Sequence, residues 1–252
     1  MNRFLTAILV FALAVPPVSA QPARELYAEG ETLDYSLSWM KIGGGVARMT
    51  IAPADGDKFR ITSVARSGGG VARFVKVRDE IETIVDRETF STLRYLKKLD
   101  EKDEKKEELT VIDGGVATRS RKGKKTRKIE VPQPLLDPIS VVYYFRTLEL
   151  APGRGYDLTL ISDGKVYTVH AKVIRREVID TPAGRFTTLM VEPEMVSGGV
   201  KKDERLFIWY TDDERHIPVR IRTEVNFGAV TASLRSMSRG VTSTEPPRSG
   251  AQ

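Results

Sequence analysis

Apolar and polar residues alternate along most of this chain with a period of two. Residues 32–40, TLDYSLSWM, divide an extended backbone into a polar side and an apolar side made of Leu33, Tyr35, Leu37 and Trp39. This pattern predicts a strand with one buried face. The segment VARMTIAP (46–53) is expected to return as a second strand, with Gly43-Gly44-Gly45 as the turn between them.

Further strands are predicted downstream. KFRITSVARS (58–67) and KVRDEIETIVD (76–86) keep the alternation, which is typical of antiparallel sheet. Turn signals at Asp163-Gly164 and Pro182-Ala183-Gly184 predict two hairpins in the second half of the chain.

Residues 97–128 are densely charged and can be interpreted in two ways. The composition fits a disordered loop, but Leu109, Val111 and the turn signal Asp113-Gly114-Gly115 favour long, solvated hairpins. We therefore expect hairpins whose outer faces carry the charges.

Two strands near the C-terminus flank an acidic connection, TDDERH (211–216). Residues 206–210 are apolar on both faces, which predicts a central, covered strand, whereas residues 217–225 place Arg220, Arg222 and Glu224 opposite an apolar face. Asp212 and Asp213 are predicted to shape the turn by hydrogen-bonding its backbone. A short polar turn gives no reason to expect an acid and base pair.

One helix is predicted near residues 138–148. Asp137 suits the N-cap, Pro138 suits the first helical position, and Ala151-Pro152-Gly153 ends the segment. The segment is apolar around much of its circumference, so we expect it to pack between other elements rather than on the surface.

Several motifs resemble a known family. IWYTDDERHIPVRI, DPISVVYYFR, TPAGRFTTLMVEP and YAEGETLDYSLSWMKIGGGVARM are similar to the exported bacterial proteins of the domain of unknown function 3108 family, over about Tyr27 to Leu234. This family implies no activity and no catalytic residues. The strand, aspartate-bearing turn and proline-led strand also resemble the end of the lipoprotein carriers LolA and LolB. That second resemblance implies an unclosed, strongly curved antiparallel sheet with helices plugging an apolar concavity.

These patterns together predict a mainly β fold: a large, strongly curved antiparallel sheet, unclosed or closed like a barrel, with one packed helix. Because one helix covers little sheet, the concave face is expected either to close on itself or to leave a pocket for an apolar ligand. The candidate lining residues, each of which would also suit a packed core, are Tyr35, Leu37, Trp39, Tyr143, Trp209 and Ile221.

The N-terminus predicts export. Residues 1–20 combine Arg3, an apolar run and a small-residue cleavage site, which is typical of a secretory signal peptide. We expect cleavage before Gln21, a single β-rich domain over residues 21–238, and a disordered tail over 239–252. No later apolar stretch is long enough to span a bilayer, so the mature chain is expected to be soluble in the periplasm.

The residue types exclude several chemistries. Zero cysteines remove disulfides, thiol catalysis, thiolate metal sites and lipoprotein acylation. The two histidines, His170 and His216, have no metal-binding spacing, and there is no nucleophile elbow and no nucleotide motif. We expect no catalysis, no metal and no cofactor.

A basic run, RSRKGKKTRK, spans residues 119–128. In the periplasm it would not meet nucleic acid, so its candidate partners are anionic envelope surfaces: lipopolysaccharide, phospholipid headgroups or acidic glycans. The alternative is a solvated hairpin. The cations concerned are Arg119, Arg121, Lys122, Lys124, Lys125, Arg127 and Lys128.

Two functions of different classes follow from the sequence. The first is a periplasmic binding or carrier module for a lipid or another apolar envelope component. The second is an envelope interaction or structural protein with a fully packed sheet, whose charged hairpins dock a partner or an anionic surface. The two differ in whether the curved sheet leaves a cavity.

Overall fold

A computed structural model describes residues 22–40, 42–68, 77–101, 104–197, 200–201, 205–225, 228–241 and 246. The predicted signal peptide, residues 1–20, lies outside the described residues. Of the predicted tail, Arg239 is the last residue of a strand, and the backbone N–H of Gly240 donates to the carbonyl of Gly30 at 3.0 Å. Most of residues 241–252 lie outside the described residues.

Fifteen described strands form one antiparallel sheet. The first eight, which follow a short helix α1 (Ala23–Leu26), are β1 (Glu31–Trp39), β2 (Ile42–Ala54), β3 (Lys58–Ser67), β4 (Val77–Asp86), β5 (Thr92–Glu101), β6 (Glu104–Asp113), β7 (Val116–Arg121) and β8 (Arg127–Glu130). The others are β9 (Gly155–Ser162), β10 (Lys165–Thr181), β11 (Gly184–Ser197), β12 (Val200–Lys201), β13 (Arg205–Thr211), β14 (Pro218–Val225) and β15 (Gly228–Arg239). The predicted hairpins at Asp113-Gly114-Gly115, Asp163-Gly164 and Pro182-Ala183-Gly184 are confirmed.

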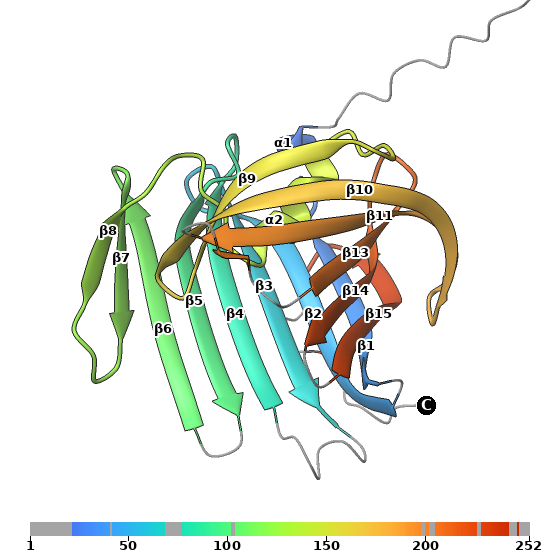
Figure 1. Ribbon diagram of the computed structural model, residues 1–252, viewed down its shortest axis with the longest axis horizontal. Helices are drawn as coiled ribbons and strands as arrows, with labels where there is room; N and C mark the ends of the chain where they lie inside the picture. The colour runs from blue at the N-terminus through green and yellow to red at the C-terminus, as the bar shows by residue number, and fades with distance from the viewer. Residues whose placement is uncertain are drawn as a thin grey trace, which may run out of the picture.

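The sheet is strongly curved but not closed. Its strand order is β8-β7-β6-β5-β4-β3-β2-β1-β15-β14-β13-β11-β10-β9, with β12 paired to β11 beside this path. The chain runs outward as a meander from β1 to β8, crosses over, and returns so that its last strand pairs with its first. Figure 1 shows β9, β10 and β11 arching over the helices. The predicted curved antiparallel sheet is therefore confirmed in its unclosed form.

The crossover connection from β8 to β9 contacts the start of β5 and the edge strand β9. The carbonyl of Leu135 accepts a hydrogen bond from the backbone N–H of Thr92 at the start of β5. Leu136 exchanges backbone hydrogen bonds with Thr159 and Ile161 of β9. Because this segment satisfies backbone groups of both strands, it bridges part of the gap that the open sheet leaves.

One predicted turn was misplaced. β2 already begins at Ile42, and the turn before it contains Met40 in a left-handed conformation with φ 46°. The glycine triplet lies within β2, where the register shift from Leu37↔Gly45 to Ser38↔Gly43 marks a β-bulge. A Cβ on Gly45 would lie 2.6 Å from the carbonyl oxygen of Arg66, so close backbone approach explains this glycine.

The predicted helix is confirmed but shorter than expected. It consists of α2 (Ser140–Tyr144) followed by the 3₁₀ turn η2 (Phe145–Thr147). Asp137 caps it as predicted, because its Oδ1 accepts hydrogen bonds from the backbone N–H groups of Ile139 and Ser140 at 2.9 and 3.1 Å. The helix is buried inside the curve of the sheet (Figure 1), where it forms one core with residues from both halves of the chain: Leu33, Tyr35, Tyr143, Phe145, Ile208, Tyr210, Val219 and Leu234.

Candidate functional site

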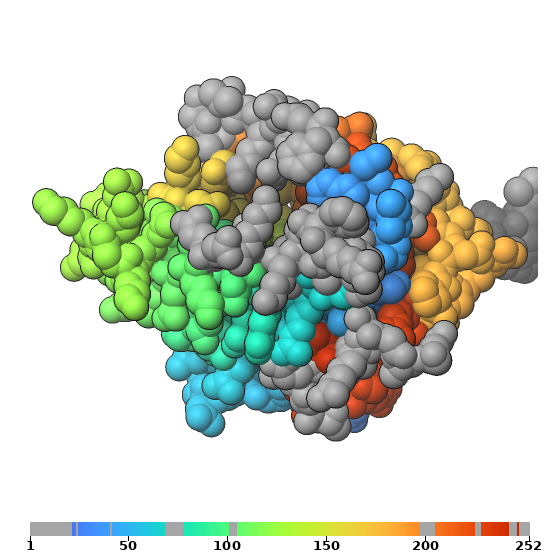
Figure 2. Space-filling model, turned by 90° about the horizontal axis from the view of Figure 1, so that it is seen from below, coloured from blue at the N-terminus to red at the C-terminus, as the bar shows by residue number. Residues whose placement is uncertain are grey.

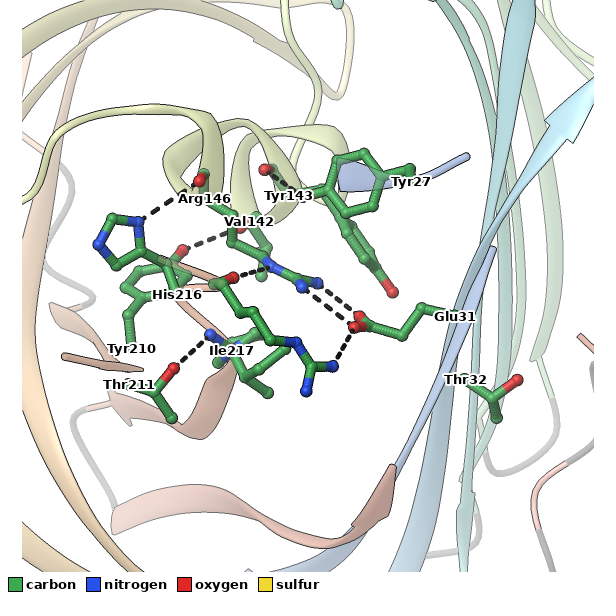
Figure 3. Close-up of polar contacts among 12 residues, drawn as sticks. Tyr27, Glu31, Thr32, Val142, Tyr143, Arg146, Tyr210, Thr211, His216 and Ile217 are labelled. Atoms are coloured by element: carbon green, nitrogen blue, oxygen red, sulfur yellow. Dashed lines mark hydrogen bonds and ion pairs between the residues drawn. The ribbon is translucent and has the colours of Figure 1, made fainter. Parts of the chain in front are cut away.

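A buried ion pair fixes the helix inside the sheet. Arg146 of η2 is only 1% exposed, and its two terminal nitrogens donate to the carboxylate oxygens of Glu31 at 2.5 and 3.0 Å. Its Nε donates to the backbone carbonyl of Arg215 at 3.0 Å. Figure 3 shows Arg146 reaching from the helix to the start of β1 and to the turn between β13 and β14. Three parts of the fold therefore meet at one guanidinium.

Two tyrosine rings lie against the guanidinium of this ion pair. The Arg146 guanidinium lies 5.1 Å from the ring centroid of Tyr27 and 5.7 Å from that of Tyr143. The hydroxyl of Tyr27 donates to the carbonyl of Tyr143 at 2.8 Å, and burial raises the pKa of that hydroxyl well above its ordinary range. Because the charged groups are paired and covered, the cluster is suited to anchoring α2 rather than to receiving a ligand.

The acidic connection between β13 and β14 is a turn, as predicted. Asp213 Oδ1 accepts from the hydroxyl of Thr211 at 2.7 Å and from the backbone N–H groups of Arg215 and His216 at 3.1 and 3.2 Å. Asp212 instead pairs with Arg176 at 2.5 Å, which ties the turn to β10. The two carboxylates thus have separate structural partners.

A groove opens on the sheet face opposite the helix. Side chains of β13 alternate between the two faces: Ile208 and Tyr210 point into the core, where the Tyr210 hydroxyl donates to the carbonyl of Val142 at 3.0 Å, while Phe207 and Trp209 point the other way. The groove has a volume of about 1210 Å³. Its apolar lining is Met40, Ile174, Met190, Phe207, Trp209 and Ala229.

Charged side chains border this apolar lining. Cross-strand register puts Arg220 beside Trp209 and Arg222 beside Phe207, while Met190 of β11 is the other neighbour of Trp209. Trp209 is held in place by a hydrogen bond of 2.7 Å from its Nε1 to Glu177. The charged lining residues are four arginines and two glutamates, which leaves a net charge of +2: Arg175, Arg205, Arg220, Arg222, Glu192 and Glu224.

The glutamates neutralise some of these arginines but not all. Glu192 pairs with Arg205 at 2.8 Å, and Glu224 pairs with Arg222 at 3.0 Å. The half-buried Arg220 differs, because its Nη2 donates to the backbone carbonyl of Asp180 at 2.5 Å and no carboxylate of the described residues lies within ion-pair distance of it. The direct partner of the Asp180 carboxyl is Arg185 at 2.8 Å, and this hydrogen bond, helped by the charge of Arg220, lowers the pKa of that carboxyl. The Arg220 guanidinium lies 5.8 Å from the ring centroid of Trp209. The groove therefore combines an apolar floor with one arginine that has no carboxylate within ion-pair distance in the described chain.

The structure separates the predicted ligand-binding residues. Trp209 lines the groove. Tyr35 and Tyr143 are 1% and 0% exposed in the core, and the Tyr35 hydroxyl donates to the carbonyl of Pro218 at 2.7 Å. Leu37 of β1 and Ile221 of β14 are partly buried and pack against the same core. Trp39, the last residue of β1, is also partly buried. At Tyr35 and Tyr143 the helix-bearing face is packed core, the second of the two roles expected for these residues.

Sequence reasoning did not identify the groove, although one signal was available. The alternation of β14 places its charged residues opposite the apolar face, and the groove is on that charged side. Phe207 was expected to be covered, and at 8% exposure it is, yet it contributes to the groove wall. The arginines of β10 and β13, Arg175 and Arg205, carried no sequence pattern that linked them to β14.

The predicted basic contact residues lie on the β7–β8 hairpin and behave in two ways. Arg119 donates to both carboxylate oxygens of Glu108 at 2.6 and 2.5 Å, and Arg121 lies 3.7 Å from the same carboxylate. The other five are exposed, in the turn and on the edge strand: Lys122, Lys124, Lys125, Arg127 and Lys128.

Two kinds of feature are absent from the part of the chain that the structure describes. No three acidic or histidine side chains there gather as a metal site would require. No helix there has the length and apolar character needed to cross a bilayer.

Comparisons with known proteins identify a family and one solved structure of similar fold. Residues 33–235 match the model of a family described as a protein of unknown function, DUF3108. The crystal structure of a β-barrel-like protein of domain of unknown function DUF1849 from Brucella abortus is similar, with a TM-score of 0.61 and 11% sequence identity over 83% of this chain and 97% of that chain. A protein with a YmcC-like fold from Bacteroides fragilis aligns with a TM-score of 0.35 and 12% identity over 84% and 96% of the two chains. No curated protein matches the sequence.

Proposed function

Because this chain belongs to the DUF3108 family, whose function is unknown, its role must be inferred from its own groove, and we propose that it is a non-enzymatic binding or carrier module of the cell envelope that holds an anionic amphiphile. The observation that carries the proposal is the groove of about 1210 Å³ on β13–β15, with Trp209 and Phe207 in its wall and Arg220 beside them with no carboxylate of the described residues within ion-pair distance.

The groove chemistry supports an amphiphile rather than a purely apolar ligand. Aromatic and methionine side chains can cover an acyl chain, since ligand sites are mostly apolar with a few placed polar groups. A guanidinium beside that apolar surface is suited to a carboxylate or phosphate group at the end of the chain. No nucleotide motif accompanies the groove in the sequence, so release would depend on the relative affinity of donor and acceptor.

The location outside the cytoplasm is inferred from residues 1–20 alone. We expect the mature chain to begin at Gln21 and to be released from cells by osmotic shock. N-terminal sequencing of the released protein tests this, and a retained Met1 in the membrane fraction would contradict it.

The second function considered from the sequence, a packed envelope interaction protein, is favoured by one observation. The interior around α2 is a packed core with a buried ion pair, so the concave face of the sheet has no room for a ligand beside the helix. The groove lies on the other face, however, and a packed interior is compatible with ligand binding there. We therefore favour the binding module.

The experiment uses the two tryptophans of the chain. In the variant Trp39→Phe, Trp209 becomes the sole tryptophan and reports directly on the groove. We would titrate this protein with lysophosphatidylglycerol and with lysophosphatidylcholine of the same acyl length, both below the concentration at which they form micelles. We expect the anionic lipid to shift the Trp209 emission and to bind more tightly than the zwitterionic lipid.

A variant tests the arginine. Arg220→Gln is expected to weaken binding of the anionic lipid by about 10- to 100-fold, the usual effect of losing a charged hydrogen bond. Arg60→Gln, on the exposed surface of β3 beside Glu82, removes the same charge outside the groove and should leave binding unchanged. No emission change with either lipid would overturn the proposal, and equal affinity for both lipids would contradict the role of Arg220.

A further inference from the structure

The net positive charge of the chain is concentrated in one turn. The sequence holds 40 basic and 34 acidic residues, a net charge of +6. Residues 122–128 contain five cations and no acidic residue, so the rest of the chain sums to +1. Elsewhere on the sheet, cations lie beside carboxylates of neighbouring strands, as with Arg48 and Asp34 at 2.7 Å or Arg94 and Glu82 at 2.5 Å. The turn differs from these paired cations because it gathers five positive charges with no acidic residue among them.

The structure leaves these five cations exposed and without counter-ions. None of them has an ion-pair partner within the part of the chain that the structure describes. Glu108 of β6, whose strand partner is Arg121, is already bound by Arg119 and Arg121. The five residues, which we call the basic tip, are Lys122, Lys124, Lys125, Arg127 and Lys128.

The basic tip projects from one end of the molecule. Figure 1 shows the β7–β8 hairpin at one end of the longest axis, with the bend of β10 at the other, and Figure 2 shows the same hairpin projecting when the molecule is seen from below. Register places Arg127 beside Arg119 and Lys128 beside Thr118, so successive cations of β8 point to opposite faces of the sheet. The charges therefore surround a convex tip rather than line a groove.

We propose that the basic tip is a docking surface for an anionic lipid bilayer. A convex, positively charged tip has no concavity in which to hold a discrete ligand, but it can enter the headgroup layer of a flat anionic surface. Residues 114–130 contain no aromatic side chain, so stacking on sugar rings is not available. Four of the five cations are lysines, which act as hydrated point charges rather than as forks for one specific anion. This docking is independent of the ligand groove.

The test is sedimentation of the purified mature chain with vesicles of phosphatidylglycerol and phosphatidylethanolamine, compared with vesicles of phosphatidylcholine, at low and high salt. Juxtamembrane cations attract anionic surfaces by about 1 kcal/mol each, which corresponds to roughly fivefold in affinity per charge. The variant Lys122→Gln/Lys124→Gln/Lys125→Gln is therefore expected to bind the anionic vesicles about 100-fold more weakly. Binding of the wild type should disappear at about 1 M salt, where the Debye length is only about 3 Å.

A matched control removes three exposed, ion-paired cations from other strands: Lys98→Gln/Lys105→Gln/Arg239→Gln, whose partners are Glu80, Asp100 and Glu29. This variant has the same net charge as the tip variant and should keep its vesicle binding. Circular dichroism of both variants checks that they fold. The proposal is overturned if the wild type does not sediment with anionic vesicles, if both variants lose binding equally, or if the tip binds soluble heparin but not vesicles, which would indicate an anionic polymer instead.

Discussion

Arg146 and Glu31 lie 115 positions apart in the chain and form a bidentate ion pair inside the curved sheet. The pair joins the crossover helix to β1, which is the strand that pairs with the last strand, β15. A buried pair of this kind is a weak argument for stability in itself, but each partner is costly to leave alone in a low-dielectric core.

The ion pair gives the first prediction. Arg146→Met removes the bidentate partner of the buried Glu31 carboxylate and leaves it only the exposed Arg215, at 3.5 Å, so we expect the free energy of unfolding to fall by about 3 to 5 kcal/mol in urea denaturation. The double variant Glu31→Leu/Arg146→Met removes both charges and should regain much of that loss. Additive losses in the double variant would show that the two side chains are not coupled.

Two fully buried tyrosines give a matched pair of variants. Tyr35→Phe removes the donor to the carbonyl of Pro218, so we expect a loss of about 1 to 2 kcal/mol in the free energy of unfolding. The Tyr143 hydroxyl is buried with no hydrogen-bond partner among the described residues, so Tyr143→Phe should be neutral or stabilising. Equal effects of the two changes in chemical denaturation would contradict this assignment.

The turn between β13 and β14 gives the third prediction. Asparagine retains the Oδ1 that accepts the three hydrogen bonds of Asp213, so Asp213→Asn should change stability by less than about 1 kcal/mol, whereas Asp213→Ala should cost about 1 to 2 kcal/mol. Asp212→Asn weakens a partly exposed ion pair with Arg176 and should cost at most about 1 kcal/mol. Thermal melts of the three variants measure this order, and loss of ligand binding in folded Asp213→Asn would speak against a purely structural role.

The fourth prediction concerns pH. Burial lowers the pKa of His216 below its ordinary value, and its Nδ1 lies 3.4 Å from the carbonyl of Arg146. The unfolded chain therefore binds a proton at a higher pH than the folded chain does, so stability is lost as pH falls through about 6.5, the ordinary histidine pKa. His216→Asn should reduce this loss, because the asparagine amide does not titrate in this range. Asparagine also tolerates the left-handed backbone at this position, where φ is 42°.

The measurement is the free energy of unfolding between pH 7.5 and about 5, compared among variants. His170→Asn, which changes an exposed histidine paired with Asp157, serves as the control. Burial raises the pKa of Asp137, which contributes in the opposite direction at lower pH, but this contribution is common to all the variants and cancels in the comparison. An unchanged pH dependence in His216→Asn would contradict the prediction.

Local patterns determined the elements of this fold. Alternation in residues 58–67 and turn signals such as Asp163-Gly164 act over a few positions, and the structure has the strand and the hairpin where they were expected. The cap at Asp137 and the turn at Asp213 were also readable, because short polar side chains bond to backbone within three residues. Gly43-Gly44-Gly45 was misread, because a glycine can serve a bulge and a close approach as well as a turn.

The site depended on tertiary structure. A period of two tells which side chains of a strand share a face, but not which face another layer will cover. Leu37 and Ile221 were therefore expected either in a pocket or in a packed core, and the structure packs them against the core. The charged face that carries Arg220 was expected, but not that it lines a groove. The pairing of β1 with β15 and of Arg146 with Glu31 joins residues more than a hundred positions apart, and no local pattern encodes such contacts because they exist only once the sheet has curved around the helix.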